Sequence, residues 1–449
     1  MKKILCFVLV LAMVFSLAAC SKAPAAETNT PAPEASQPSS SGESSSSGES
    51  SGEVESTDSE YAPIFGVPDA DMVNGMLMPK DVESRADIDK GLPSESKSNL
   101  KIGFCQATLS NPYFVAIQEA AQAACDAYGY EVIFMNSETD GEQMIANCEA
   151  FLSQGVDAIV LDPCDVKAAN SIVAQCVAQG VPVVGIGGAL DPSCATLTSI
   201  LANNYLNGWE AGIVAGEALK DAESIKAVSI IGLTGFANSK SRINGEVAGM
   251  VYTMLNARGQ EVSVNEARYI AYGYVEELFS AGKTTVKEIN MTIGGYGEGE
   301  WTDEGGMRAM EDLLTANPDV QLVLAENDWM AMGAIRAIEA AGYTAGEDVL
   351  LISAADGSQE AMDQVKAGKL LCTGYNPPDM LGKCSIDLIH MIFEEGYDAS
   401  NMPAATSLDA FAITKDNVDQ FYDSPTGYVK AYDIVWKTID DLAAEADFS

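Results

Sequence analysis

From residue 101 onward, short apolar runs alternate with longer amphipathic stretches, and this alternation limits the possible fold more than any other feature of the chain. The apolar runs have the length of buried strands, and the amphipathic stretches have the spacing of helices. Strands are expected at 101–106, 130–135, 158–161 and 182–187, with helices at 112–129, 142–154 and 166–179. Repeated strand–helix units with buried strands form a parallel sheet covered by helices on both faces. The first lobe is therefore predicted to be a doubly wound α/β sheet.

A second series of the same kind begins near residue 204 and predicts a second lobe. Helices are expected at 204–220, 241–257, 302–316 and 329–341, and strands at 226–231, 322–325 and 349–354. The region between them carries a helical pattern at 274–281, a strand-like run at 286–293 and a glycine-rich run at 294–299, which we interpret as a loop beside the cleft. Ligands of open parallel sheets bind at the carboxyl ends of the strands, so two such sheets facing each other form a shared cleft.

The order of these segments predicts two doubly wound parallel-sheet lobes joined by a hinge, which together form an α/β clamshell. Lobe 1 is expected to contain 100–203 and 376–406, and lobe 2 to contain 204–375 and 407–449. The crossings between the lobes are expected near Asn203, Asn376 and Ser407. Rotation at such crossings would open and close the cleft.

The first residues of the chain have the pattern of an export signal. Lys2 and Lys3 precede an apolar run at 4–17, which is too short to span a bilayer. The run ends in Leu-Ala-Ala-Cys, and small residues directly before Cys20 are typical of a bacterial lipoprotein cleavage site. We therefore predict a signal peptide at 1–19 and a lipidated Cys20 that anchors the exported protein to the cell membrane, on its extracellular or periplasmic side. The alternative is an ordinary signal peptide with an incidental cysteine.

Residues 20–60 are expected to form a disordered tether between the lipid and the folded body. They are mainly Ser, Gly, Pro, Ala and Glu, with hardly a large apolar side chain. Such a segment cannot bury enough apolar surface to offset the entropy lost on ordering. Residues 61–99 then form an N-terminal extension ahead of lobe 1.

Charge, cysteine spacing and histidine content restrict the chemistry. The formal net charge is −40 at pH 7, and an acidic body repels the phosphate backbone, so nucleic acid is not an expected partner. Eight cysteines follow residue 100 without a C-x-x-C pair, so we expect mostly free, buried thiols rather than zinc or redox sites. His390, the single histidine, lies in an apolar run and is expected to be a packed helix residue. These features favour binding over catalysis, with no metal and no cofactor.

Motifs at the predicted strand ends occur in the order found in a known family. The segments that carry this similarity are 108–114 (Thr-Leu-Ser-Asn-Pro-Tyr-Phe), 155–159, 180–184, 314–320, 325–328 (Ala-Glu-Asn-Asp), 356–357 and 368–377. Between about residue 101 and residue 411 the chain resembles the ribose/galactose family of periplasmic sugar-binding proteins, which belongs with the ligand-binding cores of the lac-repressor type. The resemblance implies a clamshell like that of the type I periplasmic binding proteins, acting as the substrate-binding lipoprotein of an ABC importer.

The resemblance also implies a set of ligand-binding residues. It places Asn111, Tyr113 and Phe114 on the first lobe, Trp301, Asn327 and Asp356 on the second lobe, and Asn376 near the hinge. Aromatic rings can stack on the C–H faces of a sugar, and Asn and Asp side chains can pair with neighbouring hydroxyl groups. The same residues also have structural interpretations, namely helix capping for Asn111, turn formation for Asp356 and core packing for the aromatic residues of the first lobe.

Two features depart from the pattern of the family. After the fourth strand the family commonly has an Asp-Arg pair, whereas this chain has Gly187 and Gly188, which let the backbone approach a ligand closely or leave room for a bulkier one. A second family arginine opens the helix after the first strand of lobe 2. The candidate there is Arg242, and alternative registers place Asn244 or Glu246 at this point. We therefore expect a sugar, polyol or sugar-like molecule other than ribose.

These features together predict a monomeric binding protein that closes over its ligand and then docks on an ABC permease in the membrane. The alternative is a sensor that presents the ligand to a chemoreceptor or a histidine kinase, and the sequence does not distinguish the two. Paired carboxylates for glycoside hydrolysis are the remaining enzymatic alternative in so acidic a chain.

Overall fold

The computed structural model describes residues 84–188, 190–234, 236–408, 410–422, 426–429, 431, 434 and 436–440. Contacts divide the chain into residues 1–55 and 56–449, and every described residue belongs to the second unit. The predicted signal peptide, the lipidation site Cys20, the tether and the first part of the extension at 61–99 lie outside the described residues. None of the described helices has the length and hydropathy of a membrane span.

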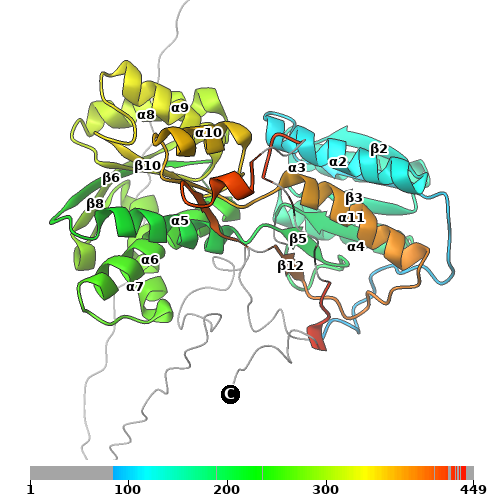
Figure 1. The fold of residues 1–449 in the computed structure, drawn as a ribbon. Helices are drawn as coiled ribbons and strands as arrows, with labels where there is room; N and C mark the ends of the chain where they lie inside the picture. The colour runs from blue at the N-terminus through cyan, green and yellow to red at the C-terminus, as the bar shows by residue number, and fades with distance from the viewer. Residues whose placement is uncertain are drawn as a thin grey trace, which may run out of the picture. The chain divides into compact units, whose positions relative to one another are not determined.

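The first sheet is parallel throughout and has the strand order β12-β5-β4-β3-β1-β2 (Figure 1). Its strands are β1 (Lys101–Gln106), β2 (Glu131–Asn136), β3 (Ala158–Leu161), β4 (Val183–Ile186), β5 (Ser199–Leu201) and β12 (Ala405–Ser407). One face is covered by α2 (Pro112–Tyr128) and α11 (Pro378–Phe393), the other by α3 (Gly141–Ser153) and α4 (Val166–Ala178). This is the doubly wound sheet that the sequence predicts.

Alternating side chains and helix caps explain the first lobe locally. Phe104 and Val160 pack beneath α2 and α11, whereas their chain neighbours Cys105 and Leu161 pack beneath α3 and α4. Helices α2, α3 and α4 each begin after a side chain that accepts a backbone N–H, and these caps are Asn111, Asp140 and Asp165. All three helices therefore start just beyond the carboxyl ends of β1, β2 and β3.

The second sheet has the order β10-β9-β6-β8-β7, with β7 antiparallel to β8 and the other pairs parallel. Its strands are β6 (Ile225–Ile231), β7 (Thr284–Val286), β8 (Met291–Glu298), β9 (Leu322–Ala325) and β10 (Leu350–Ser353). One face is covered by α5 (Asn204–Leu219), α6 (Ala237–Ala257) and α7 (Val264–Ala281), the other by α8 (Asp303–Ala316), α9 (Asp328–Ala340) and α10 (Gln359–Ala367). Two α/β lobes are thus present, as predicted.

The chain passes between the two sheets after β5, after β11 (Cys372–Gly374) and after β12. Strand β11 pairs with β13 (Ala412–Thr414) in a short antiparallel ribbon beside the second sheet. Asn203 caps α5 directly after the first of these connections, Asn376 lies between β11 and α11, and Ser407 is the last residue of β12. The positions expected for a hinge therefore lie on the connecting segments.

The glycine-rich run at 294–299 was expected to be a loop, and this interpretation was wrong because most of the run belongs to β8. Strand β8 pairs with β6, and its glycines make room for neighbouring side chains. A Cβ at Gly294 would lie 3.0 Å from Cγ of Asn317, and one at Gly297 would lie 2.8 Å from Cβ of Ala309. These glycines therefore reflect close packing rather than a turn. Helix α7 also begins well before the expected residue 274, at a capping box formed by Ser263 and its partner at the third helical position.

Helices α5 and α6 approach each other closely along glycines. A Cβ at Gly208 on α5 would lie 2.9 Å from the carbonyl carbon of Arg242, and one at Gly245 on α6 would lie 2.6 Å from the amide nitrogen of Trp209. Each helix carries a further glycine one turn later, at Gly212 and Gly249, that also faces the other helix. Because no side chain separates the two backbones, this contact fixes where α6 places Arg242.

Residues 84–100 are joined to the first lobe by two buried cationic side chains. The Arg85 guanidinium donates hydrogen bonds to backbone carbonyls on both sides of the β5–β12 edge, those of Cys194, Thr196, Leu197, Met402 and Pro403. The Lys90 ammonium donates to the carbonyls of Ala399 and Ser400. Burial and the nearby charge of Arg85 lower the pKa of Lys90 to about 7.

The eight cysteines of the described residues are free thiols, and all except Cys164 are fully buried. His390 lies on α11, where its ring stacks on Tyr128 with centroids 3.9 Å apart and its Nδ1 lies 2.7 Å from the hydroxyl of Tyr130. It is a packed helix residue, as predicted. Within the part of the chain that the structure describes, no three His, Cys, Asp or Glu side chains are arranged to hold a metal ion.

Candidate ligand-binding site

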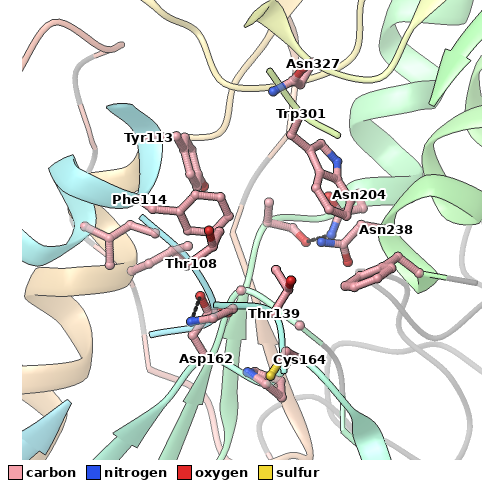
Figure 2. A pocket seen from close by; sticks show the side chains of 18 of the residues that line it. Thr108, Tyr113, Phe114, Thr139, Asp162, Cys164, Asn204, Asn238, Trp301 and Asn327 are labelled. Carbon is pink, nitrogen blue, oxygen red and sulfur yellow. Dashed lines mark hydrogen bonds between the residues drawn. The ribbon is translucent and has the colours of Figure 1, made fainter. Parts of the chain in front are cut away.

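A cavity of about 460 Å³ lies between the carboxyl ends of the strands of the two sheets (Figure 2). Its wall combines aromatic rings with amide, carboxylate and hydroxyl groups from both lobes. On the first lobe it includes every predicted residue, namely Asn111, Tyr113, Phe114, Gly187 and Gly188. From the second lobe and the connections it includes Arg242, Trp301, Asn327, Asp356 and Asn376. The structure therefore brings these predicted residues together around one space.

The beginning of α2 positions the first-lobe side of the cavity. Asn111 caps the helix through Oδ1, which accepts the backbone N–H of Tyr113 at 2.9 Å. The hydroxyl of Tyr113 in turn donates to Oδ1 of Asn376 at 2.8 Å, and the ring of Phe114 packs edge-on against the Tyr113 ring. Figure 2 shows Tyr113 and Phe114 across the cavity from Trp301. The capping and packing roles suggested by the sequence are thus real, and they coexist with a place in the wall.

Arg242 reaches the cavity from the first turns of α6. Its Nε donates to Oδ1 of Asn204 at 2.9 Å, and its Nη1 donates to the backbone carbonyl of Glu326 at 3.1 Å. These bonds fix the plane of the guanidinium, and Arg242 as a whole is only 5% exposed. Behind it lies Glu246, whose buried carboxyl oxygens have no hydrogen-bond partner among the described residues. Burial and the neighbouring Glu326 raise the pKa of Glu246 well above its ordinary value, while Arg242 opposes the shift.

The structure decides among the registers left open for the family arginine. Arg242 lines the cavity, whereas Asn244 does not. Asn244 lies within α6, where its Nδ2 donates to the carbonyl of Lys240 at 2.8 Å. Two residues along a helix turn the side chain through about 200°, so a residue two positions after one that faces the cavity points away from it. Glu246 likewise lies behind the wall rather than on it.

Asp356 is held in the wall by a buried polar network. Its Oδ2 accepts a hydrogen bond from Nδ2 of Asn327 at 2.9 Å, and its backbone has a φ of 103°, a conformation that L-residues rarely adopt. The adjacent Asp328 accepts from the hydroxyls of Ser353 and Thr373, at 2.6 Å each, and from the amide of Ser358 at 2.7 Å. Burial, followed by the charge of Asp328, raises the pKa of Asp356 to about 7, while Arg242 and the hydrogen bond from Asn327 oppose the shift.

Trp301 presents its indole to the cavity from the connection between β8 and α8. Both Glu300 and Trp301 have a φ of 54°, so the turn is a constrained one. Gly232 opposite has no side chain, and a Cβ there would overlap the indole. Phe236 packs edge-on against the indole with ring centroids 5.1 Å apart. The carbonyl of Trp301 accepts a hydrogen bond from Nδ2 of Asn111 at 3.0 Å, which joins the two lobes across the cavity.

Several residues of the wall were not identified from the sequence. They include Thr139, Asp162, Cys164, Asn204, Phe236 and Asn238. Asp162 directly follows β3, so its position at a strand end was the available signal. Asp162 differs from an aspartate in a surface turn only in its burial, which the sequence does not show. It is 5% exposed, and its Oδ2 accepts the backbone N–H of Ala107 at 3.2 Å. Burial raises the pKa of Asp162 to about 7, with the Ala107 hydrogen bond acting in the opposite direction.

Comparison with known proteins agrees with this architecture. Residues 102–396 match the family of periplasmic binding protein domains, and this chain belongs to that family. It is 26% identical over 303 residues to the ribose import binding protein of Bacillus subtilis (strain 168), covering 66% of this chain and 84% of that protein. It is 24% identical over 307 residues to the D-apiose import binding protein of Paraburkholderia graminis, covering 68% of this chain and 85% of that one.

A solved structure shows the same fold. The solute binding protein of Bacillus halodurans C-125 with bound myo-inositol superimposes with a TM-score of 0.57 at 22% identity, covering 73% of this chain and 99% of that one. The two sheets and their helices thus form a type I periplasmic binding protein fold.

Proposed function

We propose that this protein is the extracytoplasmic solute-binding component of an ABC importer and that it holds a sugar or polyol in the cavity between its lobes. The observation that carries the proposal is a cavity with aromatic rings on both sides and hydrogen-bonding groups between them. Apolar C–H faces suit the rings, and hydroxyl groups suit the amides and carboxylates. Relatives named for ribose and apiose import support the same class of ligand.

The proposed mechanism is closure of two lobes over the ligand. The lobe of the first sheet, which includes β12 up to Ser407, would rotate against the lobe of the second sheet about the connecting segments. The expected assignment of 407–449 to lobe 2 does not hold for Ser407, Ile434 and Trp436, which belong to the first sheet or pack on its core. A ligand touching both walls favours the closed form because it makes its full set of contacts only there. The hydrogen bond from Asn111 to the Trp301 carbonyl would be made on closure and lost on opening. The closed form, as a monomer, would then dock on a membrane permease.

The residues proposed to contact the ligand divide by chemistry. Tyr113, Phe114 and Trp301 would stack on the ring, and Arg242 and Asp356 would bind hydroxyl groups. The side-chain amides of Asn111 and Asn327 each make two hydrogen bonds to other protein groups, so their role would be mainly to hold the two walls in place. The sequence resemblance implies an Asp-Arg pair where this chain has Gly187 and Gly188, and this difference supports a ligand other than ribose.

Binding is tested with calorimetry on the purified protein. D-Ribose, D-allose, L-arabinose, D-galactose and myo-inositol form the first panel, and a dissociation constant near 1 μM corresponds to roughly 8 kcal/mol. Trp301→Ala should weaken binding at least about tenfold because it removes a stacking surface. The matched control is Trp329→Ala, since Trp329 lies outside the cavity wall. Absence of heat with every sugar and polyol, both neutral and aminated, would reject the proposed ligand class.

Turnover is not part of the proposal. Mass spectrometry of a bound sugar before and after incubation should recover it unchanged. Appearance of a hydrolysis product that disappears in Asp356→Asn would replace binding with glycoside hydrolysis.

Membrane attachment through Cys20 is the remaining element of the proposal. It rests on the small residues before this cysteine and on the polar segment after it. Cells grown with a labelled fatty acid should incorporate label into the wild type but not into Cys20→Ser, and the variant should be released from the membrane. Equal labelling of both proteins would exclude Cys20 as the site of lipid attachment.

A further inference from the structure

A buried carboxylate on the first-lobe side of the cavity has no cation beside it. Asp162 lies at the end of β3, and Figure 2 shows it in the wall near Thr108 and Thr139. Its Oδ2 accepts one backbone N–H, from Ala107. A Cβ on Gly187 would lie 2.8 Å from Oδ1 of Asp162, so the carboxylate fits beside this glycine where a larger residue would clash with it. Among the described residues, Oδ1 has no hydrogen-bond donor.

The other charged groups of the wall do not compensate Asp162. The only cationic side chains among the residues lining the described cavity are Lys167 and Arg242. Lys167 is exposed at the start of α4, next to the exposed Asp165, so this pair lies in solvent at the rim. Burial and one backbone hydrogen bond are the influences on the pKa of Asp162, and no cation is among them. A carboxylate removed from water without a cationic partner is costly, so its presence points to a partner supplied from outside the protein.

Arg242 belongs to a different and already acidic part of the site. Burial raises the pKa values of Glu246, Glu326 and Asp356, and the nearby charge of Arg242 opposes each rise. Arg242 is thus surrounded by carboxyl groups of the second lobe, and its charge is not among the influences on the pKa of Asp162. Asp162 on the first-lobe wall is therefore left without a cationic partner among the described residues that line the cavity.

We propose that the natural ligand carries a cationic amine that pairs with Asp162, which makes it an amino sugar or an aminated polyol rather than a neutral one. The proposal rests on the proposed function and names the substrate class of that same site. An ammonium group donates hydrogen bonds to the free Oδ1 and supplies the missing positive charge. Phe114 lies on the same wall, and its ring can also contact a cation or the sugar face beside it.

The test compares matched pairs of sugars that differ by one amine. Calorimetry at pH 7.5 uses D-glucosamine with D-glucose, D-galactosamine with D-galactose, and D-mannosamine with D-mannose, and the N-acetyl forms serve as uncharged controls. The amine of at least one pair should bind about tenfold or more tightly than its hydroxyl partner, as expected for a buried charged hydrogen bond. Asp162→Asn should remove this preference, and the matched control Asp165→Asn, which retains a capping side chain at the rim, should keep it.

The pH dependence provides an independent readout. The thiols of Cys105 and Cys164 lie close enough for the charge of Asp162 to act on their pKa values. The charged groups across the cavity are Arg242 and Asp356, and Asp165 and Lys167 lie at the rim. Below about pH 7 the Asp162 carboxyl of the free protein is protonated, so amine affinity should fall by up to about tenfold per pH unit as the pH decreases. Asp162→Asn should flatten this dependence, which a merely structural role would not do.

The outcomes separate the two proposals. Neutral sugars or polyols that bind while no amine binds more tightly would overturn the amine proposal and leave the binding function in place. Binding of none of the amines, sugars and polyols would reject the proposed function and the amine proposal together. Ligand released from the protein as purified, measured by accurate mass, adds a direct check, because the proposal requires nitrogen in its formula and a nitrogen-free ligand would refute it.

Discussion

Replacing Gly208 by alanine should destabilise the second lobe, although alanine is the better helix former. Gly208 is buried on α5, and its missing Cβ would lie 2.9 Å from the carbonyl carbon and 3.0 Å from the Cα of Arg242. Both of these atoms belong to the backbone of α6, so no rotamer change relieves the contact. Helix α6 is itself fixed from behind, because Ile243 and Val247 are fully buried in the core of the lobe.

The size of the effect follows from this geometry. Ordinary contact begins near 3.4 Å and the Cβ would also overlap the carbonyl oxygen of Arg242, so α5 and α6 must separate by more than about 0.5 Å. Overpacking of this kind costs about 1–3 kcal/mol, and the upper half of that range applies where two backbones collide. Alanine recovers about 1 kcal/mol through helix propensity. The free energy of unfolding should therefore fall by about 1–2 kcal/mol.

The assay is urea unfolding followed by tryptophan fluorescence, since Trp209 lies on the same helix and is buried in the same core. With a slope of about 3 kcal/mol per M, the midpoint should move down by roughly 0.3–0.7 M. Gly273→Ala on α7 is the matched control, because a Cβ there meets nothing within 4 Å and should stabilise the protein by about 0.5–1 kcal/mol. If Gly208→Ala also raised the midpoint, glycine contacts would not set the distance between α5 and α6.

Three further changes test other parts of the structure. Arg85→Lys replaces the guanidinium, whose N–H groups donate to several backbone carbonyls, by an ammonium with fewer donors. The free energy of unfolding should fall by about 2 kcal/mol and the melting temperature by several degrees. An unchanged melting temperature would show that these hydrogen bonds are dispensable. A maleimide should modify Cys164 before the other thiols, slowly at neutral pH because burial raises its pKa to about 12, and a bound sugar should protect it; equal labelling of all the thiols would contradict the described burial. Asp162→Asn should stabilise the ligand-free protein increasingly from pH 4 to pH 7, by up to about 4 kcal/mol, because the raised folded-state pKa makes ionisation of the wild-type carboxyl destabilising as the pH rises. Urea unfolding at pH 4.5 and pH 8 measures the difference in unfolding free energy between variant and wild type. The same difference at both pH values would exclude this linkage.

The sequence was most informative where a local pattern has one physical solution. The strands at 101–106, 158–161 and 322–325 have the predicted bounds, because a short apolar run between polar turns can be buried in few ways. The run at 294–299 misled because glycine has two uses. In a turn it provides a rare backbone conformation, and in β8 it makes room for Ala309 and Asn317, which are distant in sequence. Nothing in the local sequence distinguishes these two uses.

The same limit applies to the site. The predicted residues follow strands of both sheets, and motif order alone was enough to propose them. Asp162 also follows a strand, but a carboxylate there is common in surface turns and only the three-dimensional packing against Gly187 shows that it is buried. The prediction that Arg242 lines the cavity depended on the register of α6. That register follows from where the helix starts after Phe236, and an apolar sequence pattern locates a helix start only to within a residue or two.

Asn111, which the sequence offered either as a helix cap or as a site residue, serves both purposes, and Asn327 also caps a helix while lining the cavity. The chemistry of the amide explains why. Asn111 uses its oxygen to cap α2 and its nitrogen to reach the Trp301 carbonyl on the other lobe. Asn327 uses its oxygen to cap α9 and its nitrogen to hold Asp356. Aspartate would cap equally well but has no donor, and serine has only one short hydroxyl. An amide that caps a helix can therefore hold a second group at the same time, on the opposite wall for Asn111 and on the same wall for Asn327. For Asn111 the structural and the functional interpretations are thus not alternatives.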